Sequence, residues 1–348
     1  MNPNQAPKVS VLMLTYNHEP YIDDAICGVL RQKCPFPYEL VIADDHSTDG
    51  TEARCRAWAA RYPDRIRYLR NDTNQGLALN FMKSYATLRG QYVAICEGDD
   101  WWCSRHKLRR QVRWLDAHPD YVLCFHRVIN YYSDTGVKSL SNGGKFARRD
   151  LTLLDLAAHC SVTNVSAVWR RGLFGPLPEW FAQVPTYDYA MHLLNAQYGK
   201  ARFMPRPMAV YRQHSGAIWS TAGIEKSTRI ACGIRRLLIA HFAARQNYAV
   251  CDRLLEVYLN GLARLERLAQ KGQGFSEKGA RETAEIRKAI TSLPYPAPAE
   301  AQRRYAETLR RAEAQATRPA SLAQRIGRLL TALRATLSRA IPLPRPHL

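Results

Sequence analysis

The sequence predicts an α/β fold in which helices cover a mostly parallel sheet, with a helical extension at the carboxyl end. Over the first hundred residues, apolar β-forming segments alternate with segments of helical spacing, and such alternation implies right-handed βαβ crossovers. Two acidic clusters, Asp44-Asp45 and Glu97-Gly98-Asp99-Asp100, each follow one of these apolar segments directly. Because open α/β sheets bind ligands at the carboxyl ends of their strands, the clusters predict a ligand site there.

The segments follow one another in a regular order. Residues 9–15 are apolar and predict a strand, and apolar side chains at helical spacing predict a helix over residues 21–32. The pattern then repeats, with strands predicted at residues 39–43, 66–69, 92–96 and 121–125 and helices at residues 51–62, 77–88 and 104–118.

The regular order stops after residue 125. Residues 134–149 are rich in Gly, Ser and basic side chains, which predicts a loop that either covers a site or is only a surface excursion. A strand at 166–170, a helix at 188–197 and an extended segment at 208–211 are expected to complete the compact part. We therefore divide the chain into a compact domain at residues 1–222, a helical extension at residues 223–293 and a basic amphipathic tail at residues 294–348.

The composition is that of a globular chain with unevenly distributed charge. The 348 residues are 46% hydrophobic and 23% charged, and the formal net charge is +20 with a pI near 9.8. Residues 220–348 hold 23 Lys and Arg against 10 Asp and Glu, so most of the excess lies in the C-terminal third. Nine cysteines without a Cys-x-x-Cys pair predict reduced packing residues rather than a zinc site.

The end of the chain has the pattern of an amphipathic cationic helix. From Arg318 onward there are six Arg and no acidic residue, and Leu and Ile recur at spacings of three and four. Such a helix suits the interface of an anionic bilayer, and packing on a partner helix or on the protein itself is the alternative. No secretory leader and no run of about 18 apolar residues occurs. We therefore expect a cytoplasmic protein, peripheral on the inner face of the cytoplasmic membrane.

The two acidic clusters also indicate the chemistry of the site. Carboxylates this close repel one another unless a cation, a proton or hydrogen-bond donors offset their charge. Carboxylate oxygens suit Mg²⁺ or Mn²⁺, so a divalent metal with a phosphate-bearing ligand is the first hypothesis. Solvated turn residues are the alternative for either cluster alone.

Six motifs, in order, resemble those of family 2 glycosyltransferases: TYNHEPYIDDAICGVLRQ, ADDHSTDGT, NQGLALN, CEGDDWW, TYDYAMHLL and YRQHSGAIWS. The resemblance covers about residues 8–220 and leaves the C-terminal third unexplained. It implies a GT-A fold, a nucleotide-diphosphate sugar donor, a divalent metal and inversion at the anomeric carbon.

The resemblance assigns the donor side of the site to residues of the first four motifs. It implies that one member of the pair Asp44 and Asp45 reads the nucleobase, usually uracil, and that Asp99 holds the metal. Glu97 stands where the family usually has Asp and would contact the sugar and ribose. The other donor residues that it implies are Thr15, Tyr16, Asn17, Glu19, Gly76, Asn80 and Asp100.

The last two motifs supply the implied catalytic base and the segment over the diphosphate. Asp188 resembles the family's base, which takes a proton from the acceptor hydroxyl, although Tyr187 stands where the family commonly has Glu. An N-cap role is the alternative for Asp188. Arg212 and His214 resemble the segment that closes over the diphosphate, where His214 would ligate the metal or bond a phosphate oxygen unless it is only structural.

We therefore expect a metal-dependent inverting glycosyltransferase that uses a nucleotide sugar, with a UDP-sugar as the first candidate, and a saccharide or lipid-linked acceptor in cell-surface polysaccharide synthesis. One alternative is a nucleic-acid-binding protein that uses its Arg-rich tail, which leaves the acidic clusters unexplained, so we expect no nucleic-acid partner. The other is a sugar nucleotidyltransferase, but no Gly-rich phosphate loop follows the first strand. Trp101 and Trp102 offer stacking faces for a sugar, unless they are core residues.

Overall fold

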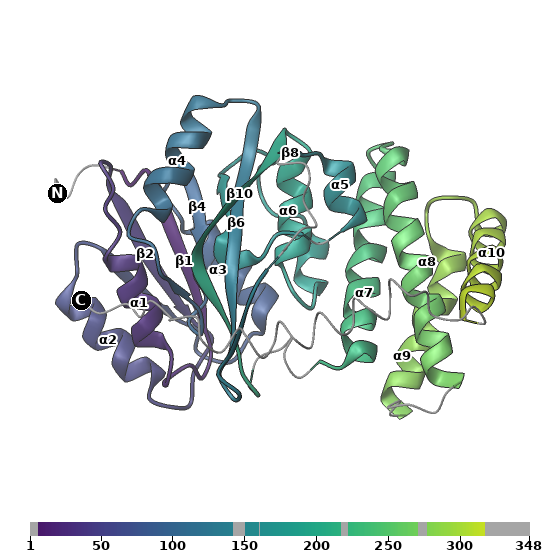
Figure 1. Ribbon diagram of the computed structural model, residues 1–348, viewed down its shortest axis with the longest axis horizontal. Helices are drawn as coiled ribbons and strands as arrows, with labels where there is room; N and C mark the ends of the chain where they lie inside the picture. Colours follow the sequence, from purple (N-terminus) through teal and green to yellow (C-terminus); the bar gives the residue numbers. More distant parts are fainter. Residues whose placement is uncertain (1–5, 142–149, 160, 217–221, 271–276, 317–348) are drawn as a thin grey trace.

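A twisted sheet with helices on both faces forms the centre of the molecule (Figure 1). The computed structural model describes residues 6–141, 150–159, 161–216, 222–270 and 277–316. Within these residues the strand order is β3-β2-β1-β4-β9-β6-β10-β5, with β7 paired to β6 and β8 to β10. The predicted α/β architecture with a mostly parallel sheet and a helical C-terminal region is confirmed.

The first half of the sheet follows the predicted alternation of strands and helices. It consists of β1 (Val9–Thr15), α1 (Ile22–Leu30), β2 (Tyr38–Asp44), α2 (Thr51–Arg61), β3 (Ile66–Arg70), α3 (Leu77–Ala86) and β4 (Tyr92–Ile95). β1 pairs in parallel with both β2 and β4, and β2 pairs in parallel with β3. The loops after β1, β2 and β4 therefore meet at one edge of the sheet.

Side chains of β1 alternate between two hydrophobic layers, as the pleat of a strand requires. Leu12 and Leu14 belong to the apolar cluster that includes α3, whereas Val11 and Met13 belong to the cluster that includes α1 and α4. All seven residues of β1 are buried. Cover on both faces explains why the sequence of this strand is a continuous apolar run.

The second half of the sheet differs from the prediction. It contains β5 (Trp101–Trp102), α4 (Lys107–Ala117), β6 (Tyr121–Tyr132), β7 (Val137–Leu140), β8 (Asp150–Leu151), α5 (Leu153–Ala158), η1 (Asn164–Ser166), β9 (Val168–Arg170), η2 (Glu179–Gln183), α6 (Asp188–Ala196) and β10 (Lys200–Gln213). β6 and β10 form a long parallel pair, and β9 runs antiparallel between β4 and β6. Both long strands exceed their predicted lengths.

Two local expectations need correction. The predicted loop at residues 134–149 contains β7, which pairs antiparallel with β6, while residues 142–149 lie outside the described part. The two tryptophans are core residues rather than stacking surfaces, since Trp101 is 2% exposed and Trp102 is 0% exposed. Neither lines the cavity described below.

Four helices extend the molecule beyond the sheet, at the right of Figure 1. They are α7 (Ile224–Ala243), α8 (Tyr248–Gln270), α9 (Glu277–Lys288) and α10 (Pro298–Ala316), with the short η3 (Ala289–Ser292) after α9. Leu238 of α7 and Leu255 of α8 belong to the same apolar cluster as Leu194 of α6. The extension therefore shares the core of the compact domain, and the domain boundaries at residues 222 and 293 stay predictions.

The predicted cationic membrane helix after Arg318 lies outside the described residues. Within the described ranges, none of the helices combines the length and apolar character needed to cross a bilayer.

Lys107 at the start of α4 is a basic side chain in the core. It is 0% exposed, and its Nζ has no hydrogen-bond partner among the described residues. Nζ lies 4.2 Å from the centroid of the Trp102 ring. Burial lowers the pKa of Lys107 to about 7, because a desolvated ammonium loses its hydration.

We expect Lys107→Met to stabilise the fold near neutral pH by on the order of 1–3 kcal/mol, because it removes this buried amine. Between the folded pKa of about 7 and the ordinary value of 10.5, the unfolded chain binds more protons than the folded one. The free energy of unfolding of the parent protein should therefore rise with pH across that window. Urea unfolding at neutral and mildly alkaline pH measures both effects.

The exposed Lys226 provides the control, since Lys226→Met should change neither the stability nor its pH dependence. If the parent protein and Lys107→Met gain equal stability on raising the pH, a neutral Lys107 in the fold is ruled out.

Candidate active site

A cavity of about 500 Å³ opens at the carboxyl edge of the sheet. The loops after β1, β2 and β4, the start of α3, η1 and the start of α6 contribute its walls. It brings together most of the predicted site residues, namely Thr15, Tyr16, Asp45, Gly76, Asn80, Glu97, Asp99, Asp100 and Asp188. The other predicted residues, Asn17, Glu19, Asp44, Arg212 and His214, are not among its lining residues.

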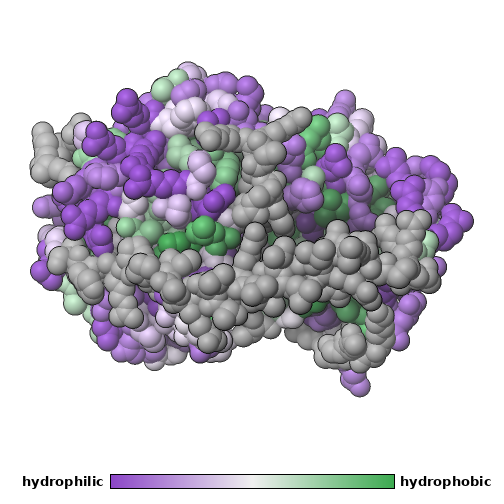
Figure 2. Space-filling model, viewed as in Figure 1, coloured by the Kyte–Doolittle hydropathy of each residue, from purple (hydrophilic) through white to green (hydrophobic). Residues whose placement is uncertain are grey.

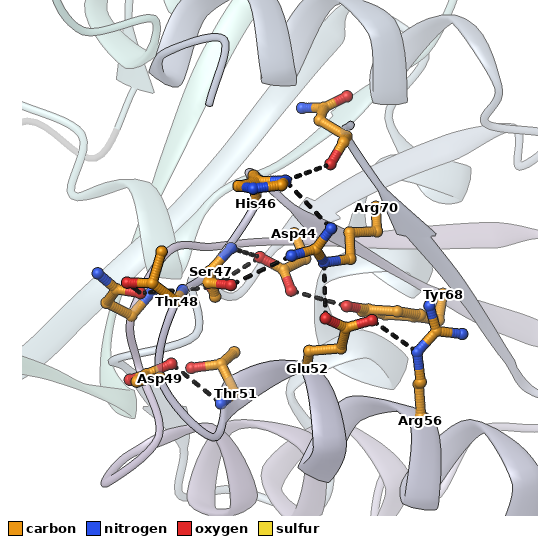
Figure 3. Close-up of polar contacts among 12 residues, drawn as sticks. Asp44, His46, Ser47, Thr48, Asp49, Thr51, Glu52, Arg56, Tyr68 and Arg70 are labelled. Atoms are coloured by element: carbon orange, nitrogen blue, oxygen red, sulfur yellow. Dashed lines mark hydrogen bonds and ion pairs between the residues drawn. The ribbon is translucent and has the colours of Figure 1, made fainter. Parts of the chain in front are cut away.

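The two members of the first acidic pair have different environments. Asp44 is 0% exposed, and its carboxylate accepts hydrogen bonds from Ser47 N at 2.8 Å, Ser47 Oγ at 2.6 Å and Tyr68 Oη at 2.7 Å. Figure 3 shows this network, which Arg70 and Glu52 extend with an ion pair of 2.9 Å. Asp44 thus ties the loop after β2 to β3 and does not line the cavity.

Asp45 is the member that lines the cavity. Its Oδ1 accepts from Asn71 Nδ2 and from Gln75 N, both at 2.8 Å, and its Oδ2 accepts from Gly76 N at 2.8 Å. A carboxylate has about four acceptor positions, so these three donors hold the group in place and leave one position. Gly76 has φ +83°, a conformation that side chains rarely adopt.

Asn17 and Glu19 act on the loop before α2 rather than on the cavity. Asn17 Oδ1 accepts from Thr48 N at 2.8 Å, and Glu19 Oε2 accepts from Gly50 N at 3.0 Å. These contacts join the loop after β1 to the loop after β2. Both residues therefore position the loops that carry Tyr16 and Asp45.

Asp99 lies between two imidazoles. Its Oδ2 is 3.3 Å from His214 Nε2 and 3.8 Å from His18 Nε2. Burial raises the pKa of Asp99, but the attraction of His18 and the hydrogen bond with His214 outweigh burial and leave the pKa below its ordinary value. The Asp99 side chain therefore carries its negative charge at neutral pH, with 17% of its surface exposed.

Glu97 is held by two residues from distant parts of the chain. Its Oε1 accepts from Asn164 Nδ2 at 2.7 Å and from Tyr187 Oη at 3.0 Å. The Tyr187 ring stacks on Phe81 with centroids 4.0 Å apart. Burial and the charge of Asp99 raise the pKa of Glu97 to about 7. Tyr187, at the position where an acid was expected, thus supports Glu97 as a hydrogen-bond donor.

Asp100 and Arg212 form the support beneath the second acidic cluster. Asp100 is 1% exposed, and its Oδ1 accepts from Arg212 N at 2.8 Å. Burial and the neighbouring carboxylates of Asp99 and Glu97 raise the pKa of Asp100. The Arg212 guanidinium donates to Asp99 O and to Asp24 Oδ2, between the rings of Tyr21 and Trp101. These contacts fix the Arg212 guanidinium, and Arg212 is not among the residues that line the cavity.

Asp188 is the first residue of α6, and the N-cap position belongs to Tyr187. Its carboxylate lines the cavity opposite the residues of β1 and β4. Burial raises the pKa of Asp188, and the backbone N–H of Tyr189 offsets part of the rise. A carboxylate with a raised pKa in a cavity is suited to accept a proton.

Sequence reasoning missed three residues of the site. His18 beside Asp99 lies inside the first motif, but nothing in its spacing separates it from an ordinary loop residue. Asn164 precedes β9 in a short polar segment, and its contact with Glu97 depends on where β9 inserts into the sheet. Tyr187 was noted only as a departure, and its donor role needs the distance to Glu97.

Asp99 and His214 fit a divalent cation that takes the rest of its ligands from a diphosphate and water. The described residues contain no group of three or more His, Cys, Asp or Glu arranged for a metal, so the protein offers one carboxylate and one imidazole. Mg²⁺ is often held by one or two carboxylates together with substrate phosphates, and Mn²⁺ accepts similar ligands. A net negative cavity supports such a cation.

The family model described as Glycosyl transferase family 2 matches residues 10–172. Residues 10–172 therefore form a glycosyltransferase family 2 domain. The match includes most of β1, both acidic clusters and η1, which contribute most of the cavity lining. Asp188 and the helical extension lie beyond it.

Two curated relatives show the range of similarity. An uncharacterized protein of Mycobacterium tuberculosis is 39% identical over 215 residues, which are 62% of this chain and 61% of that protein. This chain therefore aligns with less than two thirds of that relative's length. The Escherichia coli protein UDP-Glc:alpha-D-GlcNAc-diphosphoundecaprenol beta-1,3-glucosyltransferase WfgD is 29% identical over 189 residues, 53% of this chain and 68% of that protein.

Two solved structures share the fold of this chain. S. aureus TarS 1-349 in complex with UDP-GlcNAc has a TM-score of 0.57 at 16% identity, covering 87% of this chain and 89% of that chain. Mannosyltransferase PcManGT from Pyrobaculum calidifontis, in complex with GDP-Man and Mn²⁺, has a TM-score of 0.54 at 19% identity, covering 97% of this chain and 88% of that chain. The expected GT-A fold is confirmed.

Tyr187→Phe tests the support of Glu97. The substitution keeps the ring on Phe81 and removes the hydroxyl that donates to Glu97. We expect the free energy of unfolding to fall by about 1–3 kcal/mol, because a buried carboxyl loses one of its donors. Urea unfolding measures the loss.

Tyr198→Phe is the matched control, because Tyr198 follows the same helix and is 51% exposed. It should change stability by less than about 0.5 kcal/mol. Equal stability of Tyr187→Phe and the parent protein would show that the hydroxyl does not support Glu97.

Proposed function

We propose that this family 2 glycosyltransferase moves a sugar from a nucleotide-diphosphate donor to a saccharide or lipid-linked acceptor in cell-surface polysaccharide synthesis. The observation that carries the proposal is the single cavity in which Asp45, Asp99 and Asp188 converge from separate loops. The donors in the two solved complexes support a nucleotide sugar. The diphosphoundecaprenol in the name of the Escherichia coli relative supports a lipid-linked acceptor.

A UDP-sugar is the donor that Asp45 favours. Three donors of the protein occupy Asp45 and leave one acceptor position on a carboxylate that lines the cavity. The ring N–H of uracil would complete this set with a charge-assisted hydrogen bond. Bases without a donor at that position would leave the carboxylate under-satisfied and would bind more weakly.

The transfer is proposed to invert the anomeric carbon in one displacement. The oxygen of the acceptor hydroxyl bonds to the anomeric carbon while the bond from that carbon to the diphosphate oxygen breaks. The Asp188 carboxylate takes the hydroxyl proton, and the nucleoside diphosphate leaves with the bonding electrons. The raised pKa of Asp188 brings its basicity nearer to what this proton transfer requires.

Asp99 and His214 are the residues proposed to hold Mn²⁺ or Mg²⁺. The cation would supply positive charge against the departing diphosphate. His18, on the other side of Asp99, keeps that carboxylate oriented toward the cavity. Asn164 and Tyr187 fix Glu97 for contact with the donor sugar.

The cytoplasmic location and the contact with the inner face of the membrane remain part of the proposal. The excess of 23 basic over 10 acidic residues in residues 220–348 supports attraction to an anionic surface. The family match and the acidic cavity favour a glycosyltransferase over a nucleic-acid-binding protein or a nucleotidyltransferase.

We expect Asp188→Asn to lower the turnover number by at least about 10²-fold, because the amide cannot accept the hydroxyl proton. Donor binding should stay within a few-fold of the parent value, since Asp188 takes no part in holding the base or the metal. UDP release from UDP-glucose or UDP-GlcNAc, with a bacterial lipid extract as acceptor source, measures the rate.

Asp64→Asn, at an exposed position outside the cavity, is the matched control and should retain full activity. Undiminished transfer by Asp188→Asn would remove Asp188 from the role of base.

Asp99→Ala should abolish the dependence of donor binding on the metal. In the parent protein, UDP with Mn²⁺ is expected to raise the melting temperature more than UDP with a chelator, since a ligand that binds only the folded state stabilises it. In Asp99→Ala the two conditions should give the same small shift. The shift in melting temperature is measured for each variant against the same variant without ligand. A change in intrinsic stability therefore does not affect the comparison.

Asp72→Ala, which removes an exposed carboxylate outside the cavity lining, should keep the Mn²⁺-dependent shift. A full Mn²⁺-dependent shift in Asp99→Ala would mean that the metal is held elsewhere or is not used.

A further inference from the structure

A second cavity, of about 640 Å³, lies between α7, α8 and α10 of the helical extension. We call it the arginine groove, because four arginines line it: Arg235, Arg264, Arg267 and Arg311. Glu256 is the one acidic residue among its described lining residues, and it forms an ion pair of 2.8 Å with Arg253, which is not part of the lining. The groove shares no lining residue with the active-site cavity.

The guanidinium groups of the groove are poorly compensated. Arg235 Nε is buried and has no hydrogen-bond partner within the described residues. Arg267 donates to the Ala312 carbonyl oxygen at 3.2 Å. No ion pair joins Arg264 or Arg311 to a described residue. Positive charge and N–H donors thus converge on a cavity that supplies almost no acceptors.

The other polar side chains of the lining do not relieve this excess of donors. Thr228 Oγ1 donates to the Ile224 carbonyl oxygen at 2.6 Å, and Thr308 Oγ1 donates to the Arg304 carbonyl oxygen at 2.8 Å. These hydroxyls serve their own helices, as Thr often does within a helix. The protons of these hydroxyls are therefore engaged, and the charged donors of the groove are those of the arginines.

An anion would offset the charge of this arrangement, because like charges around one cavity repel one another. The planar fork of Arg matches phosphate oxygens with two parallel hydrogen bonds, which a halide cannot accept. A phosphate group also brings more charge and more acceptor oxygens to several arginines than a single carboxylate does. Arg264 and Arg311 are exposed, so a phosphate can reach their N–H donors, whereas Arg235 Nε is closed to solvent and Arg235 contributes its positive charge.

We propose that the arginine groove binds a phosphate group, carried either by a soluble phosphate compound or by a lipid headgroup. The surface around it fits a charged ligand, since Figure 2 shows hydrophilic side chains over the outer side of α10 at the right of the view. The proposal does not depend on sugar transfer in the active-site cavity.

Arg235 connects the groove to the helix that begins at Asp188. Its guanidinium lies over the Tyr189 ring, 5.4 Å from the ring centroid, and Tyr189 directly follows Asp188 in α6. The Tyr189 hydroxyl in turn donates to the Ala157 carbonyl oxygen at 2.8 Å. A phosphate bound by Arg235 would therefore sit beside α6, outside the active-site cavity.

The test compares the full-length protein with the double variant Arg264→Gln/Arg311→Gln. Inorganic pyrophosphate is titrated calorimetrically with a chelator present, so that the acidic active-site cavity has no metal with which to bind the anion. We expect the groove variant to bind pyrophosphate about tenfold more weakly or worse, since it loses two charge-assisted contacts. Both arginines are exposed, so the substitutions should not disturb folding.

The matched control is Arg281→Gln/Arg310→Gln, which removes the same charge from exposed positions outside the groove. It should bind pyrophosphate like the parent protein. Equal weakening in both double variants would show that only net charge matters, and unchanged binding in the groove variant would show that the arginines make no site. Either result overturns the proposal.

Vesicle flotation then identifies the source of the phosphate. Phosphatidylcholine vesicles with and without phosphatidylglycerol are mixed with the parent protein and both double variants. Loss of phosphatidylglycerol-dependent flotation in the groove variant alone assigns the site to a lipid headgroup. Flotation that is the same in all three proteins, together with the loss of pyrophosphate binding, assigns it to a soluble phosphate compound.

Discussion

Repulsion among carboxylates is the constraint that shapes the active-site cavity. The parallel pairing of β1 with β2 and β4 brings the loops after these strands to one edge, and α6 adds Asp188 from the other side. Five acidic side chains therefore line one cavity, namely Asp45, Glu97, Asp99, Asp100 and Asp188. Charges this close would destabilise the fold unless hydrogen-bond donors, positive charges or protonation offset each of them.

The surroundings that offset these charges differ from one acid to the next, so neighbouring acids have different pKa values. Asp99 gains stabilisation from two imidazoles and stays charged, whereas burial and the charge of Asp99 raise the pKa of Glu97 to about 7. Groups whose environments push their pKa values apart can take different roles in one site. The negative charge is thus concentrated where a cation would bind, and a cation there would remove one cause of the raised pKa of Glu97.

The sequence alone predicted the part of the fold in which each element depends mainly on residues near one another in the chain. Apolar strands followed by amphipathic helices predicted β1 to β4, and acids directly after strands predicted that Asp45 and Asp99 share an edge. Asp44 and Asp45 could not be told apart, because their difference depends on Tyr68 and Gly76 from other elements. The contact between Tyr187 and Glu97 joins residues 90 positions apart, which no local pattern encodes.

The long parallel pair of β6 and β10 was underestimated for a related reason. Polar residues such as Arg127, Asn130 and Arg202 interrupt the apolar pattern, yet these positions lie within the paired segments. Pairing with neighbouring strands satisfies the backbone groups whatever the side chains are, so polar residues can stand within a strand where one face is open to solvent or to a site. Arg212 and His214, at the end of β10, reach the acidic loop because of that extension.

The helical extension is bound to the catalytic half through the core rather than through a surface contact. Leu194 of α6, Leu238 of α7 and Leu255 of α8 belong to one apolar cluster, so the extension covers part of the apolar side of α6. The start of this helix carries Asp188, and the position of that carboxylate therefore depends on how α7 and α8 pack. Packed cores resist small displacements and transmit them to their neighbours. A ligand that shifted α7 at Arg235 would therefore also shift Tyr189 and, with it, the neighbouring Asp188.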